Sequence, residues 1–302
     1  MMDLVLRAPR RPRSGETVLG TSFGMYLGGK GFNQAIAAVR AGSRTAIVGR
    51  LGRDDFADQF LDCLHREGVD AGFVVADDDE GTGVGVPLVD DEGENSIVAV
   101  PRANFRVTAD DIEAAGDLIL SSDVLLVQLE LPVDAVVTAT RIAHDAGVTV
   151  VLNPAPAVAA AESFAGLVDL VVANRAETAL LTDEAHDAEP VVAARRLREA
   201  VGADVIVTLG ADGGVLVDDD GDEALSAYDV PVLDSVGAGD AFCGTLAAAL
   251  AGAVPLRTAA HRASAAGGLA VTRAGAEPSM PTATEVDDLI ATGRLRAARS
   301  RG

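Results

Sequence analysis

The sequence predicts an α/β fold in which helices cover both faces of a mainly parallel sheet, with a small β lid beside it. Short apolar runs such as Val148–Leu152 alternate with helical patterns along most of the 302 residues, as buried parallel strands joined by helices do. Two extended stretches, Glu16–Tyr26 and Gly81–Val100, interrupt the alternation without a helix of their own. No linker or internal repeat divides the sequence. We therefore predict one domain over residues 1–302, with the lid inserted in it.

Apolar periodicity and capping residues place the individual elements. The helix at Asp54–Glu67 is amphipathic, and its packed side is predicted to consist of Phe56, Phe60, Leu61 and Leu64. Thr108 is placed to cap the next helix. In chain order, the pattern predicts helices Gly31–Ala41, Asp54–Glu67 and Thr108–Leu120, strand Val124–Gln128, helix Pro132–Ala146, strands Thr149–Leu152 and Leu170–Val172, helices Ala176–Leu181 and Pro190–Val201, strand Val205–Thr208, and helices Gly239–Ala251, Leu256–Ala274 and Glu285–Ala291.

The two extended stretches are predicted to form an antiparallel flap, with a turn at the Asp-Asp-Glu-Gly sequence of residues 90–93. We place this lid at about residues 4–26 and 81–101. Its exposed edge needs cover, which a homodimer formed through the lid would supply. The acidic run Asp77–Glu80, just before the second stretch, is interpreted as a solvated turn.

The composition is strongly acidic. The 46 Asp and Glu residues outnumber the 24 Lys and Arg residues, which gives a formal net charge of -22. Such a charge repels nucleic acids and anionic membranes, and it suggests the heavily solvated surface of proteins from a very salty cytoplasm. No apolar run is long enough to span a bilayer, and no signal-peptide pattern is visible, so we predict a cytoplasmic location. Cys63 and Cys243 are interpreted as reduced core residues without a metal.

Gly237, Ala238 and Gly239 lead directly into Asp240 and a strong helix. Glycines at a helix start let backbone N–H groups approach a ligand, and these groups favour an anion together with the helix dipole. Asp240 in this first turn has two interpretations. It could simply stabilise the helix end, or it could take a proton from a hydroxyl held beside a phosphate.

A second glycine-rich helix start lies at Gly28–Ala35, with the sequence Gly-Gly-Lys-Gly-Phe-Asn-Gln-Ala. It contains Lys30, the only lysine of the chain. The segment lacks the spacing of a Walker A loop, and no strand with the dinucleotide-binding spacing leads into it. A lysine and an asparagine, Asn33, beside bare backbone suit a polyhydroxylated ligand; the alternative is a tight turn without a ligand.

The two glycine-rich segments together resemble the signature segments of the PfkB carbohydrate kinase family, and of its ribokinase branch in particular. The resemblance implies a three-layer, ribokinase-like fold and ATP-dependent phosphorylation of a small sugar at a primary hydroxyl, with D-ribose as the first choice. Deoxyribose, a nucleoside, fructose or a keto-deoxy sugar acid stay open, as does an inactive sugar- or nucleotide-binding protein. The resemblance extends in order over nearly the whole chain, through Gly15–Val18, Gln128–Glu130, Asn153–Ala157, Thr208–Gly210 and Ala270–Ser279.

The resemblance also implies roles for single residues. Asp240 would be the catalytic base. Gly237, Ala238 and Gly239 would form the anion hole for the transferred phosphoryl group. Glu130, at the end of a predicted parallel strand, would lie where such sheets bind ligands. The sugar would contact Asp3, Gly29, Lys30, Asn33, Glu130 and Asp240. The nucleotide would contact Asn174, Thr208, Gly210 and Gly239.

Two cation sites are implied in the same way. Mg²⁺ would be organised by Glu177, largely through water, although Arg175 stands where the family more often has an acidic residue. The alternative role of Glu177 is to complete a capping box with Asn174. A monovalent cation, K⁺, would be bound mostly through backbone carbonyls, by Asp234, Val236, Ala270, Arg273, Gly275 and Ser279.

The start of the chain and one residue near the sugar depart from the family pattern. The family begins with a central strand and an Asn-x-Asp element; here Asp3 matches the Asp, Met1 takes the place of the Asn, and the first strand is missing. Its loss should leave unpaired strands and an open core. We hypothesise that translation starts upstream; if it does not, Asp3 would be frayed and activity doubtful. Phe32 replaces the usual Ala and would narrow or reshape the sugar pocket.

Overall fold

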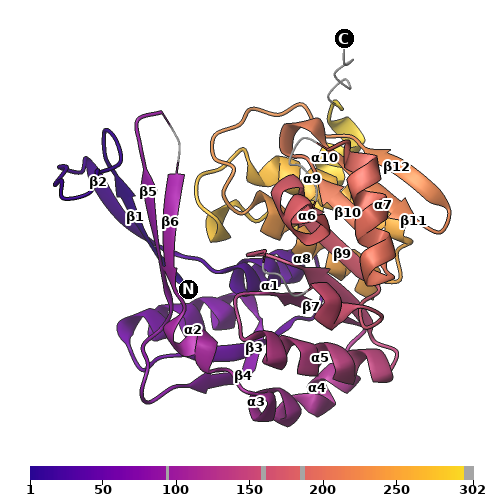
Figure 1. The fold of residues 1–302 in the computed structure, drawn as a ribbon, viewed down its shortest axis with the longest axis horizontal. Coiled ribbons are helices and arrows are strands. Elements are labelled where there is room, and N and C mark those ends of the chain that lie inside the picture. The colour runs from indigo at the N-terminus through magenta and orange to yellow at the C-terminus, as the bar shows by residue number, and fades with distance from the viewer. Residues whose placement is uncertain (93–94, 158–160, 184–187, 296–302) are drawn as a thin grey trace.

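The computed structural model describes residues 1–92, 95–157, 161–183 and 188–295 (Figure 1). The strands are β1 (Met2–Arg7), β2 (Ser22–Leu27), β3 (Ala46–Leu51), β4 (Asp70–Ala76), β5 (Val84–Val89), β6 (Asn95–Val100), β7 (Val124–Gln128), β8 (Thr149–Asn153), β9 (Leu170–Asn174), β10 (Asp204–Thr208), β11 (Gly214–Asp218) and β12 (Gly221–Leu225). The α-helices are α1 (Lys30–Arg40), α2 (Asp55–Glu67), α3 (Ala109–Ala114), α4 (Gly116–Leu120), α5 (Val133–Asp145), α6 (Arg175–Thr182), α7 (Pro190–Val201), α8 (Ala238–Ala251), α9 (Leu256–Ala270) and α10 (Ala283–Thr292).

The described strands form three sheets. The largest has the order β12-β11-β10-β9-β8-β7. Strands β7 to β10 run parallel in it, and β11 and β12 are added antiparallel at one edge. Strands β3 and β4 form a separate parallel pair, and β2-β1-β5-β6 form the lid. The predicted α/β class, with a mainly parallel sheet and a small β lid, is confirmed.

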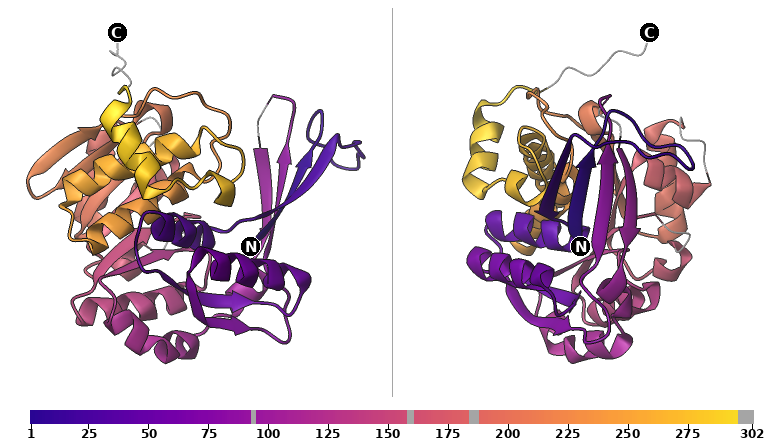
Figure 2. Two further views of the ribbon diagram at one scale, coloured as in Figure 1. Left: turned by 180° about the vertical axis from the view of Figure 1, so that it is seen from behind. Right: turned by 90° about the vertical axis from the view of Figure 1, so that its left-hand side faces the viewer.

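The inner strands of the large sheet are apolar on both sides because helices cover both faces (Figures 1 and 2). Side chains alternate along a strand. Val150 and Leu152 of β8 therefore pack in a core with α5 and α7, whereas Val151 packs in a core with α8 and α9. All three side chains are at most 2% exposed. This double burial explains the continuous apolar runs of the sequence and produces three layers.

Helices α1 and α8 pack closely and thereby bring the two glycine-rich segments together. The approach depends on Gly244 of α8, where an added Cβ would lie 2.4 Å from the backbone oxygen of Gln34 and 2.6 Å from the Cβ of Ala37. Any larger residue would push the two helices apart. Glycine is unfavourable inside a helix, so the contact with α1 explains its presence here.

Two helices differ from the predicted ones by more than one or two residues at an end. The predicted helix Thr108–Leu120 is divided into α3 and α4, while Thr108 caps α3 as expected. Helix α9 ends at Ala270 rather than at Ala274. The loop that follows is held by Asp234, whose carboxylate accepts a hydrogen bond from the backbone N–H of Gly275.

Two side chains also lie elsewhere than predicted. Leu61 of α2 is 41% exposed, whereas Phe60 and Leu64 of the same helix are buried, so Leu61 does not belong to the packed side. Asp77, assigned to a solvated turn, is buried. Its carboxylate accepts two backbone hydrogen bonds from its own turn and pairs with Arg50 at 2.9 Å. Its negative charge is therefore compensated inside the fold.

The lid is a mixed sheet and not the predicted antiparallel flap. Strand β1 pairs antiparallel with β2 but parallel with β5, and β5 pairs antiparallel with β6. The lid stands off the body in Figure 1 and is seen face-on in the right-hand view of Figure 2. The predicted turn follows β5, but its Gly93 lies outside the described residues. Within the described ranges, no helix has the length and hydropathy that a membrane span requires.

Candidate active site

Helix α8 begins without a side-chain cap. Its N-cap residue, Gly237, has a φ of 79° and no side chain to offer. Apart from a long, 3.4 Å hydrogen bond from the Ala238 N–H to the backbone oxygen of Ser235, the first N–H groups of the helix are therefore open to an external acceptor. The helix dipole adds positive potential there. A Cβ added to Gly237 would lie 3.0 Å from the Cα of Ala276, whereas one added to Gly239 would meet no atom within 4 Å. Backbone and packing thus require glycine at Gly237, while Gly239 leaves open space.

Asp240 lies in this first turn, buried between α1 and α8. One carboxylate oxygen accepts a 2.9 Å hydrogen bond from the side-chain amide of Asn33, and the other accepts a 2.9 Å bond from Gln34. Burial raises the pKa of Asp240, while the charge of Lys30 and these two hydrogen bonds oppose the shift. Asp240 is therefore a stronger base than an exposed aspartate, and it is held in one orientation.

Three further charged groups surround Asp240. Burial acts to lower the pKa of Lys30, but the charges of Asp240, Glu130 and Glu177 outweigh it and raise that pKa, so the ammonium stays protonated. Glu130, just after β7, accepts a 2.8 Å hydrogen bond from the backbone N–H of Lys30. Burial raises the pKa of both Glu130 and Glu177. The candidate site therefore holds the Lys30 ammonium among several carboxylates.

A chain of side-chain amides, to which the sequence assigned no role, holds Gln34 in place. Gln128 donates to Gln34 Oε1 over 2.5 Å, and Gln34 donates over 3.0 Å to Asn153 Oδ1 as well as to Asp240. Asn153 donates in turn to the backbone oxygen of Val172. The network orients Gln34 and, through it, Asp240. Its sequence signal is a polar residue at the end of each of two apolar parallel strands.

Asn33 carries a buried acceptor that the protein does not use. Its Nδ2 donates to Asp240, but its Oδ1 is buried and has no hydrogen-bond partner among the described residues. Leaving a buried acceptor unpaired costs about 1–3 kcal/mol. A hydroxyl group bound beside Asp240 would satisfy this oxygen.

Asp3 is an ordered residue of β1 and is not frayed. A Cβ added to Gly28 would lie 2.0 Å from Asp3 Oδ2, and one added to Gly85 would lie 2.5 Å from Oδ1. The carboxylate thus occupies room that two glycines leave. Burial raises the pKa of Asp3, the α-ammonium of Met1 opposes this shift, and the charge of Asp240 adds to it. Strand β1 therefore delivers Asp3 to the same site as Asp240.

Phe32 packs into the core between helices. It is 6% exposed, and its ring meets that of Phe60 edge-on with the centroids 4.8 Å apart. The prediction that Phe32 narrows or reshapes a sugar pocket is therefore wrong. Helix α1 instead presents Asn33 and Gln34 to Asp240, and it uses Phe32 to pack on α2.

The residues predicted to face a nucleotide end two adjacent strands. Asn174 ends β9 and Thr208 ends β10, and the two are paired in the parallel ladder. Gly210 follows with a φ of 60°. Glu177 completes a capping box with Asn174: its Oε2 accepts the Asn174 N–H, and Asn174 Oδ1 accepts the Glu177 N–H, both over 2.8 Å. The capping role weighed for Glu177 is thereby confirmed.

Asp234 ties the loop before α8 to the loop after α9. Its carboxylate accepts hydrogen bonds from the backbone N–H groups of Val236 at 3.0 Å and Gly275 at 2.9 Å. The side chain of Arg273 is engaged by Glu285. The structure thus brings together the two segments that the sequence assigned to one cation site. The other predicted ligands border the same loop, at Ala270 and Ser279.

Cys63 lies near two glutamates, with ligand-type atoms of Cys63, Glu67 and Glu277 within 4.8 Å of one another. The guanidinium of Arg40 pairs with both glutamates. It therefore supplies the positive charge that a metal ion would bring, and it ties α1 to α2 and to the loop at residue 277. Cys63 and Cys243 are both buried free thiols, as predicted.

Comparison with known proteins decides the family. The family model for pfkB family carbohydrate kinases matches residues 1–283. The chain belongs to the pfkB family of carbohydrate kinases. The resemblance seen in the sequence is thereby confirmed, and the family consists of phosphotransferases that act on an alcohol group.

This pfkB kinase is similar to ribokinases in sequence and in structure. It is 34% identical over 297 residues to a ribokinase of Schizosaccharomyces pombe, which covers 94% of this chain and 93% of the relative. It superposes on a ribokinase from Giardia lamblia with a TM-score of 0.88, 26% identity and 96% of each chain covered. An Arabidopsis thaliana ribokinase complexed with ribose and ATP gives a TM-score of 0.83, 27% identity and 96% of each chain. The fold is ribokinase-like.

The raised pKa of Asp240 predicts the acid limit of turnover by this pfkB kinase. In its predicted role as the base, the carboxylate must be unprotonated to accept a proton, so kcat/KM should fall as the pH drops through a pKa above the ordinary aspartate value of about 3.9. Asn33→Ala removes a hydrogen bond to the charged form and should move this limb to higher pH. We would measure kcat/KM for the sugar at saturating ATP. A limb at the ordinary aspartate value, unmoved by Asn33→Ala, contradicts the assignment of Asp240.

Proposed function

We propose that this kinase transfers the γ-phosphoryl group of ATP to a primary hydroxyl of a small sugar, and that the sugar is D-ribose. The observation that carries the proposal is the position of Asp240, a buried carboxylate fixed by two amides, in the open first turn of α8. Phosphoryl transfer to a hydroxyl needs a base beside an anion site. The similarity to ribokinases, one of them complexed with ribose and ATP, favours ribose over other sugars.

In this proposal the sugar hydroxyl gives its proton to Asp240 while its oxygen bonds to the γ-phosphorus. The bond from that phosphorus to the bridging oxygen of ATP breaks, and ADP leaves with the electron pair. The N–H groups at Gly237, Ala238 and Gly239 stabilise charge on the transferred group, although that of Ala238 also makes a long, 3.4 Å hydrogen bond to the backbone oxygen of Ser235. One such donor typically contributes about 10²–10³ in rate. The ammonium of Lys30 offsets the added negative charge.

The remaining polar groups of the site are proposed to hold the sugar. Asn33 Oδ1, which has no partner among the described residues, accepts a hydrogen bond from one sugar hydroxyl. The carboxylates of Asp3 and Glu130 accept from others. Gly29 is proposed to lie beside the sugar as well; its Cβ position is 2.6 Å from the Met1 nitrogen and 3.6 Å from Glu130 Oε2. Several acceptors around one base suit a ligand that carries many hydroxyl donors.

ATP is proposed to lie along the ends of β9 and β10, where Asn174, Thr208 and Gly210 are found. Glu177 would hold Mg²⁺, mainly through water. Its Oε2 serves the capping box, so Oε1 is the oxygen offered to a metal-bound water. Bound Mg²⁺ would supply charge neutralisation for the β- and γ-phosphates.

K⁺ is proposed to bind where Asp234 joins the loops on either side of it. This place adjoins the anion hole, since Gly237 packs on Ala276. We expect turnover in KCl to exceed turnover in NaCl several-fold at equal ionic strength. Equal ionic strength matters because both salts screen the formal charge of -22 to the same extent, and we propose that this acidic surface is suited to high salt. Equal turnover in the two salts contradicts the K⁺ site.

ADP release in the presence of ATP, Mg²⁺ and K⁺ tests the proposed function. Ribose should stimulate ADP release strongly over a sugar-free control, and the product should be ribose 5-phosphate. Deoxyribose, fructose and adenosine are the comparisons. Faster turnover of adenosine than of ribose would make the protein a nucleoside kinase. Binding of ribose without ADP release would instead indicate the inactive binding protein.

The lid carries exposed apolar side chains, between 44% and 65% exposed, that suit an interface. Such a patch marks an interaction surface, and we propose a homodimer that buries it. The exposed side chains are Phe23, Met25, Tyr26, Ile97, Val98 and Val100. A monomer in sedimentation velocity at micromolar concentration would refute the dimer.

A cytoplasmic location and a single domain over residues 1–302, with the lid at about 4–26 and 81–101, complete the proposal.

A further inference from the structure

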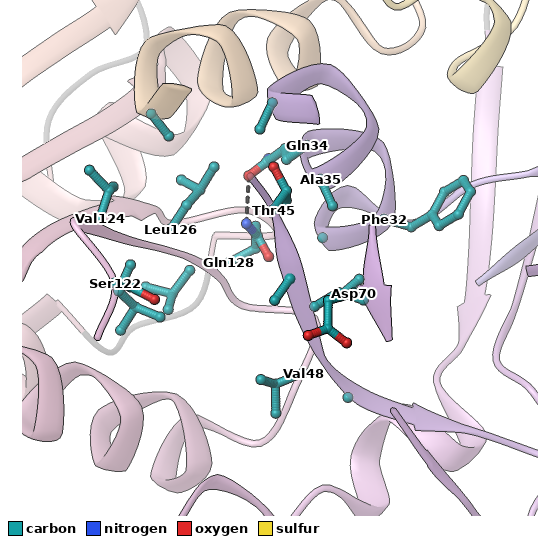
Figure 3. A pocket seen from close by; sticks show the side chains of 18 of the residues that line it. Phe32, Gln34, Ala35, Thr45, Val48, Asp70, Ser122, Val124, Leu126 and Gln128 are labelled. Carbon is teal, nitrogen blue, oxygen red and sulfur yellow. Dashed lines mark hydrogen bonds between the residues drawn. The ribbon is translucent and has the colours of Figure 1, made fainter. Parts of the chain in front are cut away.

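The end of α1 and helices α8, α9 and α10 surround a pocket of about 420 Å³, which we call the helical pocket. It is separate from the larger cavity between β3 and β7, in which Figure 3 shows the hydrogen bond between Gln34 and Gln128. Among the described residues, the two cavities share Gly42, Ala248 and Gly252 on their walls. No described residue on the wall of the helical pocket belongs to the candidate active site.

One side of helix α8 forms the floor of the helical pocket. Four residues of this helix line the pocket, at Thr245 and at the positions three, four and seven residues further on, so they lie on the same side of the helix. The last three are Ala248, Ala249 and Gly252. Their small size leaves room between α8 and the neighbouring helices. Thr245 is the member of this group that carries a polar side chain.

The hydroxyl group of Thr245 is buried without a hydrogen bond. Thr245 is 2% exposed, and its Oγ1 has no partner among the described residues. Other buried threonines in helices behave differently, because Thr140 and Thr178 each donate over 2.8 Å to the carbonyl oxygen four residues earlier. A buried hydroxyl without a partner destabilises a fold. A polar group bound in the helical pocket would supply the partner that Thr245 lacks.

The charged side chain on the wall of the helical pocket is already paired. Arg262 of α9 lines the pocket and donates to the carboxylate of Asp287 of α10 over 2.6 Å. With this guanidinium paired and a formal net charge of -22 on the protein, an anionic ligand is disfavoured. The apolar floor disfavours a cation, whose charge would be buried without a partner. The pocket therefore suits an uncharged molecule.

The volume of the helical pocket sets the size of the molecule. An apolar cavity of roughly 150 Å³ binds benzene, and pockets for small molecules generally begin at about 300 Å³. At about 420 Å³, the helical pocket has room for a ring or a branched chain of similar size together with a polar substituent. Size, charge and the free hydroxyl of the floor thus define one class of ligand.

We propose that the helical pocket binds a small uncharged molecule with an apolar body and a hydroxyl group, and that this hydroxyl forms a hydrogen bond with Thr245 Oγ1. The apolar body would contact Ala249 and Val286, which line the pocket and are buried. Thr245 follows Asp240 by five residues in α8, so it lies about 7.5 Å further along the helix axis. The ligand would therefore bind beside the helix that carries Asp240, outside the candidate active site.

Fluorine NMR of two probe molecules tests the proposal without sugar or ATP, so the result does not depend on the proposed function. 4-Fluorophenol carries a hydroxyl group on a fluorinated ring, and fluorobenzene is the same ring without it. We expect 4-fluorophenol to bind saturably and about 5-fold more tightly than fluorobenzene, because it forms one more hydrogen bond. Thr245→Val should remove this difference, and Thr245→Ser should keep it. Val48→Leu, which narrows the larger cavity instead, should leave both affinities unchanged.

Thermal unfolding of Thr245→Val gives a second, independent measurement. Its melting temperature should equal or exceed that of the wild type, because a methyl group replaces a buried hydroxyl without a partner. A clear fall would mean that the hydroxyl is paired within the protein, and it would overturn the proposal. Three binding results would do the same: no saturable binding of 4-fluorophenol at millimolar concentration, equal affinities of the two probes for the wild type, or 4-fluorophenol binding that Thr245→Val leaves unchanged.

Discussion

Asp240→Asn should lower kcat for sugar phosphorylation by about 10²–10⁴-fold, the range that a positioned general base contributes. The substitution keeps the shape of the side chain but removes the carboxylate that we propose accepts the hydroxyl proton. Lys30, the open first turn of α8 and the sugar contacts all stay in place, so KM for ATP and for ribose should change little. Steady-state kinetics with ribose and ATP would measure the loss.

The fold should tolerate this substitution because the surroundings of Asp240 can adapt. Both carboxylate oxygens now accept hydrogen bonds from amide N–H groups, and an amide at this position would turn an N–H group toward one of them. Asn33 Oδ1 is buried and has no partner among the described residues. Rotation of the Asn33 amide by half a turn would let this oxygen accept the new N–H. We therefore expect a melting temperature close to that of the wild type.

The matched control is Asp62→Asn, the same chemical change at an exposed position of α2. It should leave kcat unchanged. Near wild-type turnover by Asp240→Asn would refute Asp240 as the base. A large drop in melting temperature would mean that the loss of activity reports unfolding, and circular dichroism of the purified variants separates the two cases.

The parallel strands were predictable because their local pattern agrees with their burial. Strand β8, Thr149–Asn153, is a continuous apolar run since both of its faces are covered. Strand β12 has the sequence Gly-Asp-Glu-Ala-Leu, which shows no strand pattern, and it forms because β11 pairs with it at the sheet edge. Strand β3 contains Arg50, whose charge is compensated by Asp77 and Asp111 from distant parts of the chain. Such partners cannot be recognised from a short stretch of sequence around the strand.

The residues of the candidate site likewise divide into those that could be predicted from the sequence and those that could not. Asp240, Lys30 and Asn33 lie in glycine-rich helix starts, which are recognisable in the sequence itself. The structure brings Asn33 to Asp240, which is 207 residues away along the chain. Gln128 and Asn153 escaped assignment because their role exists only through Gln34, 94 and 119 residues away. A polar residue at a strand end is common, and only the tertiary structure distinguishes these two from other such residues. The parallel pairing of β1 with β5 was missed for the same reason.

Gly239→Ala should reduce kcat by about 10²–10³-fold, comparable with the loss of one anion-hole donor. The Cα–Cβ bond of a helical residue tilts toward the helix N-terminus, so the new methyl group points to the place where the first N–H groups of α8 would bind the transferred phosphoryl group. No protein atom lies within 4 Å of that Cβ position. The substitution therefore obstructs the ligand and not the fold. Kinetics with ribose and ATP, beside thermal unfolding, would show this.

Gly116→Ala is the matched control for Gly239→Ala. Gly116 is also a helix-start glycine whose added Cβ meets nothing within 4 Å, but it lies in α4, away from the candidate site. Both variants should be as stable as the wild type or slightly more, since alanine is favoured over glycine in helices by roughly 0.5–1 kcal/mol. Only Gly239→Ala should lose turnover. If both variants keep full activity, the first turn of α8 does not bind the phosphoryl group, and Asp240 would have to act on a phosphate held elsewhere.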